Sequence, residues 1–341
     1  MTASTEWTEK VRDDEEARFE ALAEILRGLQ RAKARNGKTN RALHAKSHGG
    51  LIGTFHVLPD LPAEAAQGLF ATPAEYPLVV RFSNGSGGHA HDDVDDVRGI
   101  GIKVIGVEGD KAIAALNDTV TQDFLMIPSD NFVIPTPEQF VGVVRAVSGN
   151  KLLALPRLIG VLGTKLPSIL SAMRAGMSTR VGSILDMRLH TGLPIRFGDY
   201  AAKLDLVPAH EPGTARVEGR DRFARELEAR ASAGDLRWTL RVQHFVDETQ
   251  TPIEDPTKSW PESVSPFIPI ARLEIPRQDP ASDEGRALTA RIDELAFDPW
   301  HALAVHRPLG AMMRARNAAY RVSTQERGAK PEPKTLSDVT G

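Results

Sequence analysis

The spacing of hydrophobic residues divides the chain into a strand-rich body and several helical stretches. Residues 12–31 place apolar side chains at helical intervals behind an acidic first turn, which predicts an amphipathic helix. Short apolar runs rich in β-branched residues, each ended by proline, glycine or polar residues, predict strands. The predicted strands lie at 50–58, 77–84, 98–106, 123–127, 192–210, 236–247 and 266–275.

Helical patterns occupy the middle and the end of the chain. Residues 137–185 predict several short helices interrupted by glycine and proline, and a last helical region runs from about 283 to 320. We therefore expect an α+β fold, with an antiparallel β-barrel surrounded by helices. The expected organisation is an N-terminal helix in 1–35, a main domain over 36–328 with a helical layer at 139–185, and a flexible polar tail at 329–341.

Composition narrows the possible chemistry. Hydrophobic residues make up 41% of the chain, charged residues 26%, and the net charge is −3, so we expect an ordinary globular protein and no nucleic-acid partner. Cysteine is absent, which excludes disulfides and thiolate ligands or nucleophiles and leaves His, Tyr, Met or carboxylates to hold a metal. No secretory signal or membrane span is expected, and a reducing, cytoplasmic location is predicted.

Three short segments, far apart in the sequence, carry the candidate chemistry. They are Arg41–Lys46 (RALHAK), Val80–Ser83 (VRFS) and Arg316–Tyr320 (RNAAY), the last followed by Arg327. Together they resemble, in the same order, the haem-binding motifs of the catalase superfamily. Two further landmarks fit the same family: Asp96–Lys103 (DVRGIGIK) and Phe297–Pro299 (FDP). The resemblance covers residues from about 38 to 328.

The resemblance implies a ferric haem b between the barrel and the C-terminal helix, with Tyr320 as the iron ligand. A tyrosine normally titrates near pH 10, so a phenolate ligand needs stabilisation. Arg316 lies one helical turn before Tyr320 and can donate hydrogen bonds to its oxygen. By the same resemblance Arg41, Arg81 and Arg327 pair with the haem propionates.

On the other side of the haem, the resemblance makes His44 the acid–base residue. It would move a proton between the two peroxide oxygens during heterolytic O–O cleavage. Ser83 fits the family serine that hydrogen-bonds the far nitrogen of this histidine.

Two departures from the family pattern modify this expectation. Compared with the family, one extra residue lies between the HAKS sequence at 44–47 and the glycine-rich strand. His48 lies in this stretch, so a second distal histidine is conceivable. The family asparagine that orients peroxide has no counterpart in residues 119–124, where Thr121 or Gln122 is the expected substitute. We therefore expect a peroxidase or weak catalase, acting on hydrogen peroxide or organic hydroperoxides with an unidentified electron donor.

Other functions stay open. The chain is much shorter than a full catalase and is similar to small bacterial catalase-related haem peroxidases and to coral allene oxide synthase. That similarity allows a fatty-acid hydroperoxide isomerase or lyase, which needs no electron donor, and a non-catalytic haem-binding protein is a third possibility. The acidic, histidine-containing stretch 89–96 is interpreted as an exposed loop rather than a metal site.

Two kinds of partner are predicted. By analogy with the family we expect a homo-oligomer, a dimer or tetramer. Residues 139–185 contain six Lys or Arg and no Asp or Glu. We interpret them as a helical layer with a solvated basic face; the alternative is a weak membrane-surface contact that admits fatty hydroperoxides.

Overall fold

A single antiparallel sheet forms the body of the protein. The computed structural model describes residues 2–32, 34, 39–148, 151–177, 182–213 and 218–341. In these residues nine strands pair in the order β4-β3-β2-β1-β9-β8-β7-β5, with β6 beside β7. The strands are β1 (Ser47–Val57), β2 (Glu75–Asn84), β3 (Arg98–Ile105), β4 (Thr121–Met126), β5 (Leu189–His190), β6 (Ile195–Phe197), β7 (Tyr200–Pro208), β8 (Leu236–His244) and β9 (Ile268–Ile275).

The sheet curls until its two outer strands meet. Just beyond β4, the amide of Ile127 donates to the carbonyl of His190 in β5 at 2.9 Å, and the reverse bond is also made. Gly53 allows β9 to lie close to β1, because a Cβ at this position would fall 2.3 Å from the carbonyl oxygen of Glu274. The prediction of a catalase-like antiparallel barrel surrounded by helices is confirmed.

Aromatic side chains fill the inside of the barrel. Phe55, Phe70, Phe124 and Phe197 are all buried and contact one another across strands that are distant in sequence. Their packing, together with the aliphatic residues of the same cluster, makes the barrel a solid core rather than a channel. Any large ligand must therefore lie between the barrel and the helices outside it.

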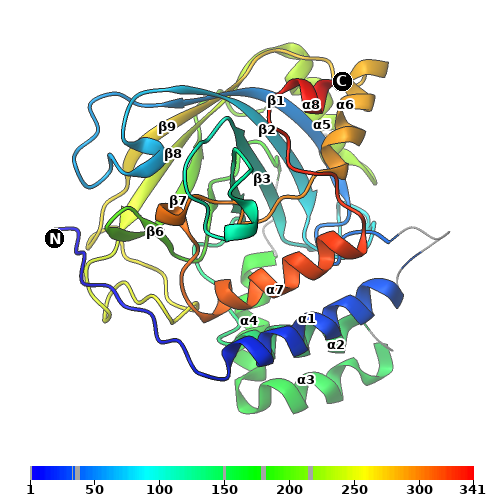
Figure 1. The fold of residues 1–341 in the computed structure, drawn as a ribbon. Helices are drawn as coiled ribbons and strands as arrows, with labels where there is room; N and C mark the ends of the chain where they lie inside the picture. The colour runs from blue at the N-terminus through cyan, green and yellow to red at the C-terminus, as the bar shows by residue number, and fades with distance from the viewer. Residues whose placement is uncertain (1, 33, 35–38, 149–150, 178–181, 214–217) are drawn as a thin grey trace.

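The helices form layers on the outside of the barrel (Figure 1). Helix α7 (Ala311–Glu326) runs beneath the barrel, α1 (Glu15–Ala32) packs on α7, and α2 (Pro137–Ser148) and α3 (Ala154–Leu162) follow on the side away from the barrel. The remaining helices are α4 (Leu166–Met177), α5 (Arg222–Ala233), α6 (Asp283–Glu294) and α8 (Ser337–Thr340).

Acidic residues fix the position of the start of helix α7. They come from the N-terminal region and from the segment between β8 and β9. The amide of Gly310 donates to Glu9, and that of Ala311 donates to Glu254. Arg314 forms ion pairs with Glu9, Glu15 and Glu254, the shortest of them 2.6 Å. Carboxylates at a helix N-terminus are electrostatically favourable, so this end of α7 has a defined position.

One prediction for the C-terminal region was wrong in detail. The sequence favoured helix from about 283 to 320, but α6 ends at Glu294 and α7 begins only at Ala311. Pro299 and Pro308 lie in the intervening segment, and a proline in a helix interior removes a hydrogen bond and clashes with the preceding turn. This non-helical segment allows α7 to turn back under the barrel.

The predicted flexible tail at 329–341 is instead packed against the barrel. Lys330 forms a parallel bridge with Leu295, and Val339 of α8 is buried with Val79, Ile105 and Ile292. Glu332 reaches a buried lysine of β3 described below. The polar composition of this segment suggested a solvated tail because important partners of its few buried residues, such as Lys103 and Val79, lie more than 200 positions away.

The predicted helical stretch within 139–185 is observed as α2, α3 and α4, joined by short 3₁₀ turns. Among the described residues, no helix is long and apolar enough to cross a membrane.

Candidate active site

His44 lies in the loop before β1, held from three sides. Its amide donates to the carbonyl of Gly85, its carbonyl accepts from Arg81 at 3.0 Å, and its ring Nδ1 lies 3.0 Å from Ser83 Oγ. The residue adopts a positive φ of 54°, an uncommon conformation for a non-glycine residue. The predicted contact between His44 and Ser83 is therefore present, and it leaves Nε2 available for proton transfer.

The surroundings of His44 keep its ring neutral. Burial, followed by the positive charges of Arg81, Arg316 and Arg41, lowers the pKa of His44 to about 3. Gly99 of β3 lies directly against the ring, since a Cβ there would be 2.8 Å from His44 Cε1. A neutral imidazole with one nitrogen bound and one free suits a residue that takes up a proton and returns it.

Tyr320 and Arg316 lie one turn apart on α7. Arg316 Nη2 donates to the phenolic oxygen of Tyr320 at 2.9 Å, as the sequence predicted. Arg316 also lies over the ring of Phe132, with 5.9 Å from its guanidinium carbon to the ring centroid. Arg316 thus supplies a charged hydrogen-bond donor to the oxygen that would bind a metal.

Three arginines that were predicted to act together lie in one cluster, in which Arg81 is buried and Arg41 and Arg327 are half-buried. Arg41 and Arg327 both donate to the backbone carbonyl of Leu295, and Arg81 pairs with Asp293 of α6 at 2.6 Å. Burial, followed by its neighbours Arg81 and Arg327, holds the pKa of Arg41 well below its ordinary value. Burial and Arg81 likewise lower the pKa of Arg327 to about 10.

This arginine cluster is short of negative charge. The carboxylate of Asp293 attracts Arg41 and Arg327 electrostatically, but it already forms an ion pair with Arg81. Three guanidinium groups against one carboxylate leave a net charge of about +2 in a poorly solvated place, which is unfavourable without an anion. The residues therefore fit a ligand that carries two negative charges.

The two halves of the candidate site face each other. Arg316 of α7 is among the charges that depress the pKa of His44, and Tyr320 is among the groups that act on Arg41. The structure thus brings together His44, Ser83 and the arginine cluster from the barrel side with Arg316 and Tyr320 from the helix side. These residues fit haem b, whose two propionates would match the surplus positive charge.

Thr121 and Gln122 are not part of this arrangement, and their predicted catalytic role is corrected. Thr121 Oγ1 donates to Glu332 at 2.7 Å, and Gln122 Oε1 accepts from the amide of Leu303 at 2.8 Å. His44 lies instead near the other end of β4, because Gly99 contacts both its ring and the carbonyl of Met126. Four or five residues of extended strand separate the two places by roughly 13–16 Å.

His48 belongs to a separate polar cluster. Its Nε2 lies 2.6 Å from Asn84 Oδ1, and its ring meets Phe223 edge-on. Asp92 in the same cluster is buried and pairs with Lys46 at 2.6 Å, although most of the 89–96 loop is exposed as predicted. A role for His48 as a second distal histidine has no support from these contacts.

A second buried charged cluster lies around Lys103 of β3. Lys103 Nζ pairs with both oxygens of Asp123, at 2.7 and 2.9 Å, and with Glu332 of the C-terminal segment. His301 Nδ1 lies 3.1 Å from Glu332 Oε1 and 3.5 Å from Asp123 Oδ2. The side chains of Asp123, His301 and Glu332 could hold a metal ion by their spacing, but Lys103 already supplies the cation between the carboxylates.

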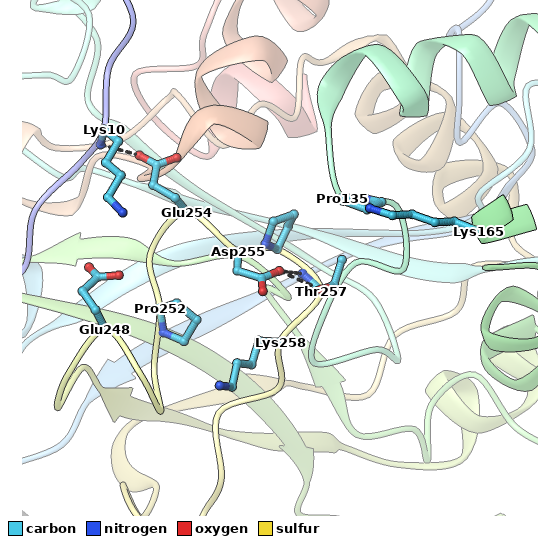
Figure 2. Close-up of a pocket in the computed structure, with 10 residues that line it drawn as sticks. Lys10, Pro135, Lys165, Glu248, Pro252, Glu254, Asp255, Thr257 and Lys258 are labelled. Carbon is cyan, nitrogen blue, oxygen red and sulfur yellow. Dashed lines mark hydrogen bonds between the residues drawn. The ribbon is translucent and has the colours of Figure 1, made fainter. Parts of the chain in front are cut away.

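An open hollow elsewhere on the surface lacks features of an active site. Figure 2 shows Lys10, Lys165, Glu248, Glu254 and Lys258 around it, with prolines between them. It contains none of the candidate active-site residues described above, and its charges are mixed in sign. We assign no function to it.

The comparisons with known proteins agree with the geometry. No family model matches the sequence. A curated relative, Catalase C of Rhizobium meliloti (strain 1021), is 26% identical over 258 residues, which is 70% of this chain and 36% of that protein. The chain is therefore similar in sequence to a catalase, at a low level of identity. It spans little more than a third of this curated relative.

Solved catalases share the fold. A fungal catalase aligns with a TM-score of 0.68 at 17% identity, covering 97% of this chain and 66% of its own. A bacterial catalase aligns with a TM-score of 0.65 at 19% identity, covering 96% and 63%. Catalase A from Saccharomyces cerevisiae gives a TM-score of 0.67 at 16% identity, covering 96% and 67%. The chain therefore corresponds to a minimal catalase core.

Sequence reasoning missed three residues of the candidate site. Gly99 supports the His44 ring, Phe132 lies against Arg316, and Asp293 pairs with Arg81. The glycines of the DVRGIGIK motif were a usable signal for close packing. Phe132 and Asp293 carried no signal, because they reach the site only through the tertiary fold.

Proposed function

We propose that this protein is a distant member of the catalase superfamily, binds haem b between the barrel and α7, and reduces peroxides. The observation that carries the proposal is the surplus of buried arginine beside a tyrosine whose oxygen accepts a bond from Arg316. Tyr320 would bind the iron, and Arg41, Arg81 and Arg327 would bind the two propionates. Bound haem would supply a redox-active ferric ion for reduction of the peroxide O–O bond.

Residues of the protein itself would carry out the proton transfer between the two peroxide oxygens. With Nδ1 bound to Ser83, His44 Nε2 can accept the proton from one peroxide oxygen and return it to the other, which leaves as water or an alcohol. The low pKa of His44 keeps this nitrogen unprotonated at neutral pH. The retained His44–Ser83 pair favours an enzyme over a protein that only stores haem.

We further propose that organic hydroperoxides, or hydrogen peroxide with a separate electron donor, react better than two molecules of hydrogen peroxide with each other. The strand end nearest to His44 runs through Met126, Ile127 and Pro128, whose side chains contain no hydrogen-bond donor. A strand end without side-chain donors provides few hydrogen bonds that could orient hydrogen peroxide. A kcat for its dismutation comparable to that of large catalases would overturn this part of the proposal.

The experiment uses the chain's other tyrosines as controls. The protein reconstituted with haemin should show a Soret band with high-spin ferric features, and Tyr320→Phe should lose or shift it. Tyr76→Phe and Tyr200→Phe should retain it, because these two residues lie on strands outside the candidate site. A parent protein that stays colourless with haemin would contradict the proposed cofactor.

Activity is tested separately from binding. His44→Ala should retain the spectrum but reduce peroxide at a rate about 10²–10⁴ lower, the usual contribution of a positioned acid–base group. His56→Gln, at a half-buried histidine of β1, serves as the control. Product analysis with and without an electron donor separates a peroxidase from a hydroperoxide isomerase, and unchanged turnover in His44→Ala would favour the haem-binding protein.

A further inference from the structure

Exposed apolar side chains of the molecule gather in one place. Six of the eight large hydrophobic residues exposed among the described residues lie between positions 147 and 170. Leu152 is 87% exposed, Leu155 58% and Ile159 53%, and Leu155 and Ile159 lie one turn apart on α3. Most of this surface comes from α3 and the turn before it, which we call the α3 face (Leu152, Leu153, Leu155 and Ile159).

The opposite side of α3 packs inside the protein, so this exposure is not a sign of a loose helix. Leu158 and Leu162 are buried with Ile134, which precedes α2, and with residues of α2 and α4 such as Val143 and Ile169. In Figure 1, α3 lies in the layer beyond α2, on the far side of α1 and α7 from the barrel. The α3 face is therefore an outward surface of a folded layer.

Three basic residues of the helical layer lie close in sequence to the α3 face. Arg145, Arg157 and Lys165 are exposed, and within the described part of the chain they form no ion pair. Most other surface arginines near the helices, such as Arg18, Arg27 and Arg31, do have acidic partners. The cations beside the apolar residues thus remain available to an external anion.

The charge is strongly segregated along the chain. Residues 139–185 carry six Lys or Arg and no Asp or Glu, a charge of +6, while the whole chain carries −3. Subtracting the segment leaves −9 on the rest of the molecule. An anionic surface would attract the helical layer and repel the remainder, which defines one orientation of approach.

We propose that the α3 face docks on anionic phospholipid membranes. The side chains of the α3 face would enter the boundary between headgroups and acyl chains, and the neighbouring arginines and lysines would contact lipid phosphates, as interfacial amphipathic helices do. Contact through a few leucines and a few cations gives reversible attachment rather than insertion. The inference concerns the outer helical layer and holds whether or not the proposed haem chemistry is correct.

A second copy of the chain is the competing occupant, and charge disfavours it. In a symmetric dimer the same patch lies on both sides of the interface, so the two basic layers would meet. The hollow in Figure 2 reaches this region at Lys165, but most of its lining residues are charged and of mixed sign, so it does not match the apolar α3 face.

The test is flotation of the full chain with vesicles of phosphatidylglycerol and phosphatidylcholine, compared with phosphatidylcholine alone. We expect binding to the anionic vesicles at low salt and at least a tenfold weaker partition to neutral vesicles. Leu155→Gln with Ile159→Gln should lower anionic-vesicle binding about tenfold or more. Arg157→Gln should lower it about fivefold, because each basic residue near an anionic membrane contributes roughly this factor.

Matched controls come from the same protein. Val11 and Val94 are exposed apolar residues outside the layer, 63% and 52% exposed, and their replacement by Gln should leave vesicle binding unchanged. Unchanged thermal midpoints would show that the exposed substitutions do not affect folding. No binding to anionic vesicles at low salt overturns the proposal, and so does a change of oligomeric state in the double variant without lipid, which would identify the α3 face as a contact between copies.

Discussion

Two clusters of positive charge, one around Lys103 of β3 and the other formed by Arg41, Arg81 and Arg327, differ in how the charge is balanced. Around Lys103, the carboxylates of Asp123 and Glu332 lie within ion-pair distance of a single ammonium group. In the arginine cluster, Arg41, Arg81 and Arg327 share the single carboxylate of Asp293. The first cluster is complete within the chain, and the second is not.

This difference separates stabilising groups from binding groups. Burial alone would lower the pKa of Lys103, but Asp123 and Glu332 outweigh it and raise the pKa above its ordinary value. Arg41 has the opposite balance, and its pKa falls. A folded protein that retains an unfavourable cluster of like charges is expected to use it for an anionic ligand. Four substitutions test this contrast through the free energy of unfolding, and they follow from the largest expected loss of stability to the smallest.

Lys103→Met should have the largest effect. It leaves the buried carboxylates of Asp123 and Glu332 without their shared cation, and breaking a buried ion pair costs about 3–5 kcal/mol. Urea unfolding of the haem-free protein measures the loss. The double variant Lys103→Met with Asp123→Asn should recover part of the lost stability. Equal stability of Lys103→Met and the parent would contradict the view that Lys103 balances these two carboxylates.

His301→Gln should have a smaller, pH-dependent effect. Burial opposes protonation, but Asp123 and Glu332 together raise the pKa of His301 to about 10. The stabilising contribution is therefore complete below the unfolded-state pKa of 6.5 and disappears as the pH rises through 10. We expect the variant to be less stable than the parent by about 2–3 kcal/mol at pH 6 and by little at pH 10. A difference that is constant with pH would show that the imidazole is neutral in the fold.

Thr121→Val should cost about 1 kcal/mol, the usual value of a hydrogen bond, because Thr121 donates to Glu332. The rate of peroxide reduction should change less than twofold, since the residue lies at the far end of β4 from His44. A tenfold loss of rate with normal haem content would restore Thr121 to the catalytic site.

Arg327→Met should change the stability of the haem-free protein least, by less than about 1 kcal/mol. Relief from burial and from the charge of Arg81 offsets the lost bonds to the carbonyls of Glu294 and Leu295. Haemin affinity should nevertheless fall at least tenfold in a haemin titration, because a propionate partner is lost. Arg272→Met, on the exposed face of β9, is the control, and equal haemin affinity in Arg327→Met would remove the arginine cluster from the proposed site.

The sequence alone determined which elements form and which residues carry the candidate chemistry. The strand patterns and the ordered RALHAK, VRFS and RNAAY segments were enough to predict the barrel, and the contacts His44–Ser83 and Arg316–Tyr320 were found as predicted. The strands and the Arg316–Tyr320 contact follow from side-chain period and helical spacing, which are local properties. The His44–Ser83 contact was implied instead by the resemblance to catalases.

Only the tertiary structure decided which predicted residues meet. It moved Thr121 and Gln122 away from His44, brought Asp293 to Arg81, and packed the C-terminal segment onto Lys103. Each of these contacts joins positions that lie far apart in the sequence. Their charge balance depends on how closely distant strands and helices pack, and no local pattern in the chain encodes that distance.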